Sequence, residues 1–388
     1  MKRAARLFAF IILLPVAVAL LAAELYFRHR DPANMRSGWT TNYELFGVGK
    51  WKKHGYVNAL GYRGQAIEIE KDDFVVLLVG DSQVECVACA DGRLPEDFLQ
   101  DFLVRQGRRA RVFSLAAAGY GPDQELLALR SYFKMGLRAD IVVVWQTLGN
   151  DIWNAQFATH STAFGIGHPK PTFRLGADGK LIEPDTGIGD IFCPLYLACL
   201  MRKFAYGSID AYWDGYLPPP AAPVGSLDPE IPVVDTEESI DREKTHWSIW
   251  MEPASPRKTY GIKLVRALYA AMIDLASVNS AKFLLFDVNR FTKEGLAQLK
   301  DIPMFSANAK YVRHDDKVYK NKVYAVSGLE GYFSTSRQVN SELPFVMFVM
   351  DRPDHVVSDA DGHFNERGNE RVMEQLAGEL VNRGWVGK

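Results

Sequence analysis

A short run of exclusively apolar residues, Phe74 to Val79, constrains the fold of this chain more than any other feature. A strand with one exposed face alternates apolar and polar side chains, whereas a strand buried on both faces does not. The run therefore predicts a strand inside a parallel sheet that is covered on both sides. Ile141–Trp145 has the same character, and further strands are predicted at Ala110–Leu115, Lys282–Asp287 and Phe345–Met350.

Segments of helical length lie between these strands. Helices are predicted at Leu94–Val104, Gln124–Phe133 and Tyr260–Val278, and a last one runs from about Glu366 to Asn382. Strands and helices that alternate at short spacing predict right-handed βαβ units. We therefore expect an α/β fold, a three-layer α/β/α sandwich with a parallel sheet, over residues 73–388.

The α/β pattern is interrupted between about residues 165 and 258. Within this stretch, Phe173–Ile182 predicts a hairpin whose turn is Asp178-Gly179. Leu217–Asp235 is rich in proline and alanine and predicts an exposed loop. Because the pattern resumes afterwards, we interpret the stretch as an insertion in one domain and not as a second domain.

The N-terminus has the composition of a membrane anchor. Basic residues come first, and residues 7–27 are then apolar except for Pro15 and Glu24. At a rise of ~1.5 Å per residue this run would span ~30 Å, the thickness of the hydrocarbon core of a bilayer. We predict an uncleaved transmembrane signal anchor at residues 1–30, with its basic end in the cytoplasm, and a juxtamembrane segment at 31–72. Small residues near the end of the run leave cleavage of a signal peptide as the alternative.

The four cysteines, Cys86, Cys89, Cys193 and Cys199, fit an exported protein, because an even number can pair in an oxidising compartment. Three connectivities are possible. A redox-active CxxC should open a helix in a thioredoxin-like context, and a zinc site should include histidines at ligand spacing. The sequence favours structural disulfides over both, and no metal or cofactor is expected. A formal net charge of −2 gives no reason to expect nucleic acid as a partner.

The first predicted strand runs directly into Gly80-Asp81-Ser82. A serine beyond the carboxyl end of a parallel strand lies where α/β sheets bind ligands, so its hydroxyl can project into the binding crevice. Main-chain N–H groups nearby can stabilise a developing oxyanion. For this tripeptide alone, the simpler interpretation is that Asp81 and Ser82 cap a helix.

Three further segments change that interpretation. The second predicted strand ends in Ala116-Ala-Ala-Gly-Tyr-Gly-Pro122, where a glycine can bring its N–H close to a substrate. The third ends in Gly149-Asn150-Asp151, where an asparagine can point its amide into the same crevice. Asp361-Gly-His363-Phe-Asn-Glu-Arg-Gly368 stands just before the last helix. All of these segments should meet at one edge of the sheet.

In these segments the chain resembles the SGNH (GDSL-type) hydrolase superfamily, whose fold is flavodoxin-like. The resemblance covers residues 74–151 and 345–382. Asn58–Gly64 is in addition similar to a leader of membrane-anchored bacterial members. The order of four motifs, each after a strand or before a helix, is more specific than any one of them.

The resemblance assigns roles to individual residues. It implies that Ser82 is the nucleophile and that His363 is the general base, which takes the serine proton and returns it to the leaving group. It also implies an oxyanion hole that consists of the Ser82 N–H, the Gly119 N–H and the Asn150 side chain. Asp361 would orient His363.

The sequence departs from the family pattern in two places. The acid is usually three residues before the histidine, but Ala360 occupies that position and aspartates flank it. We favour Asp361, because relatives that act on polysaccharides also have the Asp-Gly-His spacing, and Asp359 is the alternative. The second departure is the absence of the asparagine that often precedes Gly119, since Ser114-Leu-Ala116 stands there.

The function implied by the resemblance is acyl-ester chemistry through an acyl-serine intermediate. Anchored members resemble enzymes that add or remove O-acyl groups, above all O-acetyl groups, on cell-surface polysaccharides or exopolysaccharides. Water or a sugar hydroxyl could attack the intermediate, so both hydrolysis and transfer stay open. A lipid or lysophospholipid esterase and a noncatalytic scaffold of a polysaccharide export complex are the alternatives. The intact set of Ser82, Asn150 and His363 argues against the scaffold.

The implied location is the bacterial inner membrane, crossed once, with the catalytic domain in the periplasm. The expected partners are an acylated carbohydrate substrate, the membrane through residues 7–27, and proteins of polysaccharide biosynthesis or export.

Other polar and aromatic residues near these motifs have simpler interpretations. His355 could line the site, but a surface histidine is the simpler interpretation. Asp151 is expected to anchor its loop, and Trp145 belongs to a predicted buried strand. Trp247 and Trp250 in the insertion are better candidates for stacking on a sugar ring.

Overall fold

The computed structural model describes the α/β body of the chain and several shorter stretches. The described residues are 2–30, 56–156, 159–160, 168–169, 172–183, 233–235, 256–289, 311–314, 317–320, 328–350, 353–358 and 361–386. The predictions that concern Cys193, Cys199, Trp247 and Trp250 lie outside these residues, as does most of the predicted loop at 217–235.

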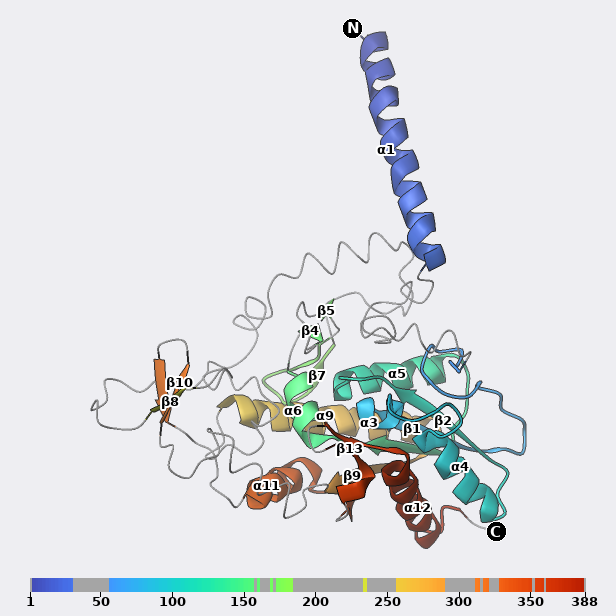
Figure 1. Cartoon of the computed structure of the whole chain (residues 1–388), viewed down its shortest axis with the longest axis vertical. Helices are drawn as coiled ribbons and strands as arrows, with labels where there is room; N and C mark the ends of the chain where they lie inside the picture. Colours follow the sequence, from blue (N-terminus) through green and yellow to red (C-terminus); the bar gives the residue numbers. More distant parts are fainter. Residues whose placement is uncertain are drawn as a thin grey trace.

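A five-stranded sheet forms the centre of the body (Figure 1). All of its pairings are parallel, in the spatial order β12-β9-β3-β1-β2. The predicted parallel sheet is therefore confirmed, with small differences at the strand ends. The strands are β1 (Phe74–Gly80), β2 (Ala110–Ala116), β3 (Ile141–Trp145), β9 (Lys282–Asn289) and β12 (Phe345–Val349).

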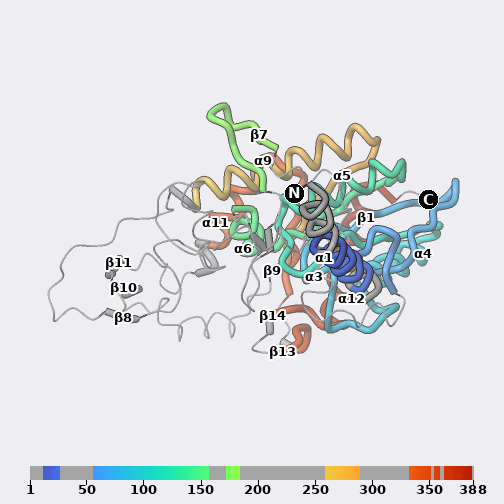
Figure 2. Tube along the Cα trace, turned by 90° about the horizontal axis from the view of Figure 1, so that it is seen from above, coloured from blue at the N-terminus to red at the C-terminus, as the bar shows by residue number. Residues whose placement is uncertain are grey.

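Helices cover both faces of the sheet and complete the three layers. Alternate residues of β1 point to opposite faces: Val75, Leu77 and Val79 belong to one hydrophobic core, and Val76 and Leu78 to the other. In Figure 1, α5 lies above the strands and α4 and α12 lie below them, while Figure 2 shows α5 and α9 side by side. The first core is completed by α5 (Pro122–Lys134), α9 (Pro256–Val278) and α11 (Gly328–Asn340), and the second by α4 (Pro95–Arg105) and α12 (Glu366–Asn382).

The chain order of the strands reverses between β1 and β3. β2 lies on one side of β1, whereas β3, β9 and β12 follow one another on the other side. This is the flavodoxin-like order, and α/β sheets bind ligands beyond the carboxyl ends of the strands at such a reversal. The residues that follow β1 and β3, including Ser82 and Asn150, lie at this point.

Some elements carry too little periodicity to be predicted from the sequence. They include α11 and the antiparallel strands β10 (Tyr311–His314) and β11 (Lys317–Lys320). The prediction of a loop over 217–235 is wrong for its last three residues, because β8 (Val233–Asp235) pairs in parallel with β10. Only a tertiary partner defines so short a strand. Another short antiparallel pair consists of β4 (Thr159–His160) and β5 (His168–Pro169).

The predicted hairpin at 173–182 is confirmed. Its strands, β6 (Arg174–Leu175) and β7 (Leu181–Ile182), pair antiparallel. In the turn, the Gly179 N–H donates to the Gly176 oxygen at 3.0 Å. Gly179 has φ of +77°, a left-handed conformation that glycine adopts without steric cost.

The segment that follows residue 55 packs on the α/β body. The Asn58 amide donates to the Ser114 oxygen on β2 at 3.1 Å, and Asn58 Oδ1 accepts the N–H groups of Leu60 and Tyr62 at 3.0 and 3.1 Å. The side chains of Leu60 and Tyr62 are buried in the core. The stretch Asn58–Gly64, which resembles a leader of anchored family members, therefore packs as an integral part of the folded domain.

The N-terminal helix α1 (Lys2–Arg30) extends away from the α/β body in Figure 1. Its side chains are described over residues 12–26, and every large apolar side chain among them is exposed. Leu13 and Leu21 are 64% and 61% exposed. Over the described residues, no helix combines the length and the hydropathy that a membrane crossing needs.

Candidate active site

The residue that ends β1 has no room for a side chain. A Cβ atom at Gly80 would lie 2.7 Å from Val84 Cγ2 and 3.3 Å from the Trp145 carbonyl oxygen. Glycine therefore lets the end of β1 lie close to the end of β3, which Trp145 forms. The turn that follows Gly80 starts from this close approach.

The turn continues into α3 (Ser82–Glu85), a single-turn helix. Asp81 is buried and caps α3, because its Oδ1 accepts the Gln83 N–H at 2.9 Å. Ser82 is the first residue of the helix and is half-buried. Asp81 is therefore a cap, as the simpler interpretation has it, while the Ser82 hydroxyl forms a different contact.

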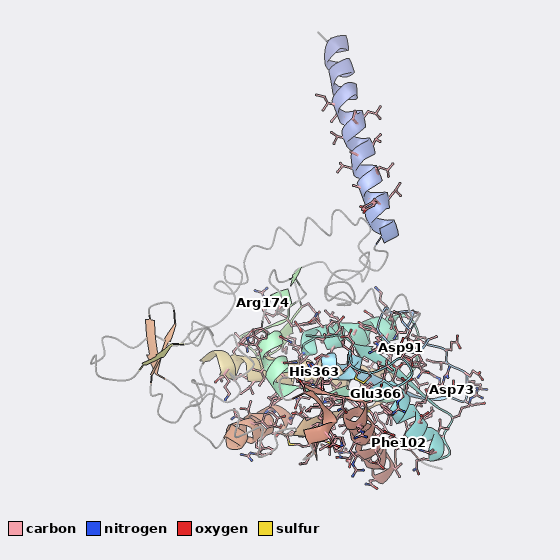
Figure 3. The ribbon with its side chains drawn as sticks, in the orientation of Figure 1. Asp73, Asp91, Phe102, Arg174, His363 and Glu366 are labelled. Carbon is pink, nitrogen blue, oxygen red and sulfur yellow. A yellow bond between two sulfur atoms is a disulfide. The ribbon has the colours of Figure 1, made fainter. Side chains whose placement is uncertain are left out.

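That contact joins two residues 281 positions apart in the chain. His363 Nε2 lies 2.8 Å from Ser82 Oγ, and the His363 side chain is exposed. With the imidazole proton on Nδ1, the hydroxyl donates to Nε2, as a general base requires. Figure 3 shows His363 well away from Asp73, which precedes β1 at the opposite end of the body.

His363 lies on β14 (Asp361–Phe364), which pairs antiparallel with β13 (Val356–Ser358). The next residue fixes this strand in two ways. The Phe364 N–H donates to Gln83 Oε1 at 3.2 Å, and the Phe364 ring packs on Trp145 with a centroid distance of 5.8 Å. These two contacts of Phe364 fix the position of the neighbouring His363 relative to α3.

Asp361 and Asp359 are the predicted candidates for the acid of a triad. The backbone of Asp361 is described as the first residue of β14, but its side chain is not, and Asp359 lies outside the described residues. The choice between them stays a prediction.

Asn150 lies on α6 (Leu148–Asn154), directly after β3. Its Nδ2 donates to Asp81 Oδ2 at 2.6 Å, next to Ser82. An amide nitrogen carries two hydrogens, so one remains for a substrate oxygen. The next residue, Asp151, accepts the Tyr269 hydroxyl at 2.8 Å and ties α6 to α9, in agreement with the predicted anchoring role.

Gly119 lies in a turn after β2. The Tyr120 N–H donates to the Ala117 oxygen at 3.1 Å, and Gly119 has φ of +74°, as the third residue of a type II turn requires. Asn154 on α6 donates to the Gly119 oxygen at 3.0 Å. In the described part of the chain, neither the Gly119 N–H nor the Ser82 N–H has an acceptor. Both predicted main-chain donors are therefore available.

Buried carboxyl groups surround this turn and helix. Burial raises the pKa of the Glu85 carboxyl to about 7, against the opposing effects of the Ala118 N–H and the Arg63 charge. Burial also raises the pKa of Glu125, and the nearby charges of Asp151 and Asp81 add to the effect. The pKa of Asp151 is raised by burial and by the Asp81 charge. These buried carboxyl groups therefore keep their protons at pH values well above those at which carboxyl groups ordinarily ionise.

These shifts predict that the protein loses stability as the pH rises from about 5 to about 8. Glu96 behaves as Glu85 does, because burial raises its pKa to about 8. In this window the folded chain holds protons that the unfolded chain has released, so raising the pH favours unfolding. Each unit of pKa difference corresponds to about 1.4 kcal/mol. Urea unfolding at several pH values measures the effect.

A variant at Glu96 provides the control for this prediction. Glu96 accepts the Gln65 and Ser114 N–H groups at 2.6 Å each, away from α3. Glu96→Gln removes one titrating group, so the loss of stability between about pH 5 and 8 should shrink. A wild-type free energy of unfolding that rises across this window contradicts the prediction.

A disulfide follows α3. Cys86 is bonded to Cys89, a pairing that belongs to one of the three connectivities left open by the sequence. Arg63, which is buried, donates to the Cys89 oxygen at 2.7 Å, and Asn369 on α12 places its amide 3.1 Å from Cys86 Sγ. The bridge therefore lies between the segment after residue 55 and the last helix. The other cysteines lie outside the described residues.

The remaining candidates take structural positions. Trp145 is buried and packs on Phe286 at a centroid distance of 5.0 Å, as predicted. His355 is half-buried, and its main-chain oxygen accepts the Asn365 N–H at the start of α12. In the described part of the chain, no three histidine, cysteine or carboxylate side chains group in a way that could hold a metal ion.

Sequence reasoning missed the residues that hold the site together. Gln83, Glu85 and Asn154 have no motif of their own, and their partners are distant in the chain. The only signal was indirect, because polar residues just after a wholly apolar strand need buried partners.

Comparison of the sequence with protein-family models finds no match, and comparison with curated proteins finds none. Among solved structures, the chain is similar to a lipase/acylhydrolase from Enterococcus faecalis, with 11% identity, a TM-score of 0.34, and coverage of 80% of this chain and 96% of that one. A lipase from a goat rumen metagenome is 12% identical, with a TM-score of 0.34 and coverage of 79% and 96%. An acetyl xylan esterase from Butyrivibrio proteoclasticus is 9% identical, with a TM-score of 0.32 and coverage of 83% and 66%.

Proposed function

We propose that this protein is a serine-dependent esterase or acyltransferase of the SGNH type. The observation that carries the proposal is the 2.8 Å contact between Ser82 Oγ and His363 Nε2. It joins a half-buried serine to an exposed imidazole at the strand-order reversal, where α/β sheets bind ligands. A nucleophile within hydrogen-bond distance of a base is the arrangement that acyl transfer needs.

The first half of the reaction forms an acyl-serine. Ser82 Oγ attacks the carbonyl carbon of the ester while its proton passes to His363 Nε2. The carbonyl oxygen becomes an oxyanion, which the Ser82 N–H, the Gly119 N–H and the Asn150 amide stabilise. When the C–O bond to the alcohol breaks, His363 returns the proton to the departing oxygen.

The second half releases the acyl group. Water or a sugar hydroxyl attacks the acyl-serine, His363 takes its proton, and collapse of the second tetrahedral intermediate returns the proton to Ser82 Oγ. Water gives hydrolysis and a sugar hydroxyl gives transfer. The two reactions use the same residues and differ only in which acceptor occupies the site.

The substrate that we propose is an O-acyl group, above all an O-acetyl group, on a cell-surface polysaccharide or exopolysaccharide. Support comes from the resemblance of Asn58–Gly64 to the leader of anchored family members and from the Asp-Gly-His spacing at Asp361. The exposed position of His363 fits a substrate that approaches from the protein surface.

Covalent labelling with a fluorophosphonate tests the chemistry, and a panel of esters tests the substrate. We expect the label on Ser82, and turnover of acetylated sugars and p-nitrophenyl acetate in preference to long acyl-chain esters. A preference for long chains or lysophospholipids would overturn the polysaccharide proposal alone. A full-length protein that is neither labelled nor active on any ester would overturn the enzyme proposal.

We further propose that α1 anchors the protein in the bacterial inner membrane and leaves the α/β domain in the periplasm. Exposed apolar side chains around a helix are unfavourable in water and favourable in lipid. The full-length protein should remain in the membrane fraction after washes with high salt and with alkali. A shortened chain that begins at Asp31 should be soluble, and fractionation followed by immunoblotting measures both.

Two outcomes contradict the anchor. Release of the full-length protein by the alkaline wash would show peripheral attachment. Recovery of a mature protein whose N-terminus lies near Glu24 would show that the segment is a cleaved signal peptide.

A further inference from the structure

Three side chains in or beside α3 each bind a different segment of the site. Asp81 accepts the Asn150 amide, Gln83 accepts the N–H of Phe364 next to His363, and Glu85 accepts the Ala118 N–H. The nucleophile turn is thus bonded to all three of the other segments in the predicted catalytic set. The first two bonds concern a predicted oxyanion donor and the base, and the third has no role in the reaction described above.

The bond from Glu85 is short and buried. Its Oε2 accepts the Ala118 N–H at 2.6 Å, and the side chain is 2% exposed. Arg63 and Asp81 are the charged groups whose fields act on it, with opposite effects. A buried acceptor that loses its donor costs the full desolvation of the group, so this bond constrains both of its partners.

Ala118 precedes Gly119 within the turn that starts at Ala117. In such a turn the second residue has no acceptor inside the turn itself, so its N–H is available to an outside group. Glu85 is that group. Because successive peptide planes share a Cα atom, a fixed Ala118 N–H limits the direction in which the Gly119 N–H points.

Further hydrogen bonds hold both α3 and the turn that Glu85 connects. Arg63 donates to the main-chain oxygens of Glu85 and Cys86, which end α3. From the other side, Asn154 holds the Gly119 oxygen. The turn at Ala117–Tyr120 is therefore held between α3 and α6. Within the described residues, the bond from Glu85 to the Ala118 N–H is the only hydrogen bond from α3 to a main-chain N–H of this turn.

We propose that Glu85 is a positioning residue of the active site: by holding the Ala118 N–H, it aligns the Gly119 N–H with the oxyanion that forms at Ser82. This inference rests on the proposed function, because it presupposes acyl transfer at Ser82. It assigns to one short helix both the nucleophile and the alignment of a donor in the turn after β2.

Glu85→Leu removes the acceptor, and Glu85→Gln keeps one. In the full-length protein we expect Glu85→Leu to lower kcat for p-nitrophenyl acetate about 10- to 100-fold, because small misplacements of an oxyanion donor are costly. The KM should stay within about twofold, since the donor acts on the transition state. Glu85→Gln should recover most of the kcat.

Asp140→Ala is the matched control. Asp140 accepts the Val75 N–H at 2.7 Å at the start of β1, so it is also a carboxylate that holds a backbone donor, but at the opposite end of the strand. It should keep the wild-type kcat. If Glu85→Leu does not fold, Ala118→Pro removes the same bond from the donor side, at a turn position that favours proline, and the same loss of kcat is expected.

The outcomes separate this inference from the proposed function. An active wild type whose kcat is unchanged in Glu85→Leu, or in Ala118→Pro where that variant replaces it, overturns the positioning role and leaves the esterase intact. Equal losses in Glu85→Leu and Glu85→Gln also overturn it, because glutamine still accepts the N–H. A wild type without activity and without labelling at Ser82 overturns the proposed function itself.

Discussion

Ser82→Ala is expected to lower ester turnover by at least about 10³-fold and to abolish fluorophosphonate labelling. The reason is chemical: alanine has no oxygen to form the acyl intermediate, and His363 then has no proton to accept. The residual rate should come only from binding and the oxyanion donors. Steady-state kinetics with p-nitrophenyl acetate and in-gel detection of the label measure the effect.

A serine outside the site supplies the control. Ser131 on α5 donates its hydroxyl to the Leu127 oxygen within the helix at 2.8 Å. Ser131→Ala should therefore keep wild-type turnover and labelling. Activity of Ser82→Ala within about tenfold of the wild type would show that another nucleophile acts.

His363→Ala is expected to cause a loss of similar size, because the serine hydroxyl is a weak nucleophile without a base. The imidazole is exposed, so its removal should leave the fold intact, and the circular dichroism spectrum and urea midpoint should match the wild type. Labelling of Ser82 should become slow instead of absent, since the nucleophile is still present.

His355→Ala tests whether any nearby imidazole suffices. His355 precedes β13 and is half-buried, and its main-chain oxygen accepts the Asn365 N–H at the start of α12. We expect near-normal turnover. A large loss in this variant combined with a small loss in His363→Ala would transfer the role of base to His355.

The acid can be assigned by comparing two further variants. Asp361→Asn is expected to cost far more turnover than Asp359→Asn, because Asp361 opens β14, the strand that carries His363. The reverse ranking would assign the acid to Asp359.

Much of the architecture follows from local patterns in the sequence. Phe74–Val79 and Ile141–Trp145 are strands because a continuous apolar run is stable only when both faces are covered. The helices are predicted because the segments between these strands have helical length and alternate with the strands. Parallel strands place their carboxyl ends at one edge, which is enough to predict that Ser82, Gly119 and Asn150 lie near one another.

The layers, the sheet and the segments that hold the candidate site residues thus follow from the sequence alone, because they depend on interactions between near neighbours in the chain. The side chains that hold these segments together are recognisable only in the folded structure. Glu85 binds a residue 33 positions away and Gln83 one 281 positions away, and no periodicity records such pairs. A buried acceptor takes whatever donor the fold brings within about 3 Å, so its partner is defined by packing and not by spacing.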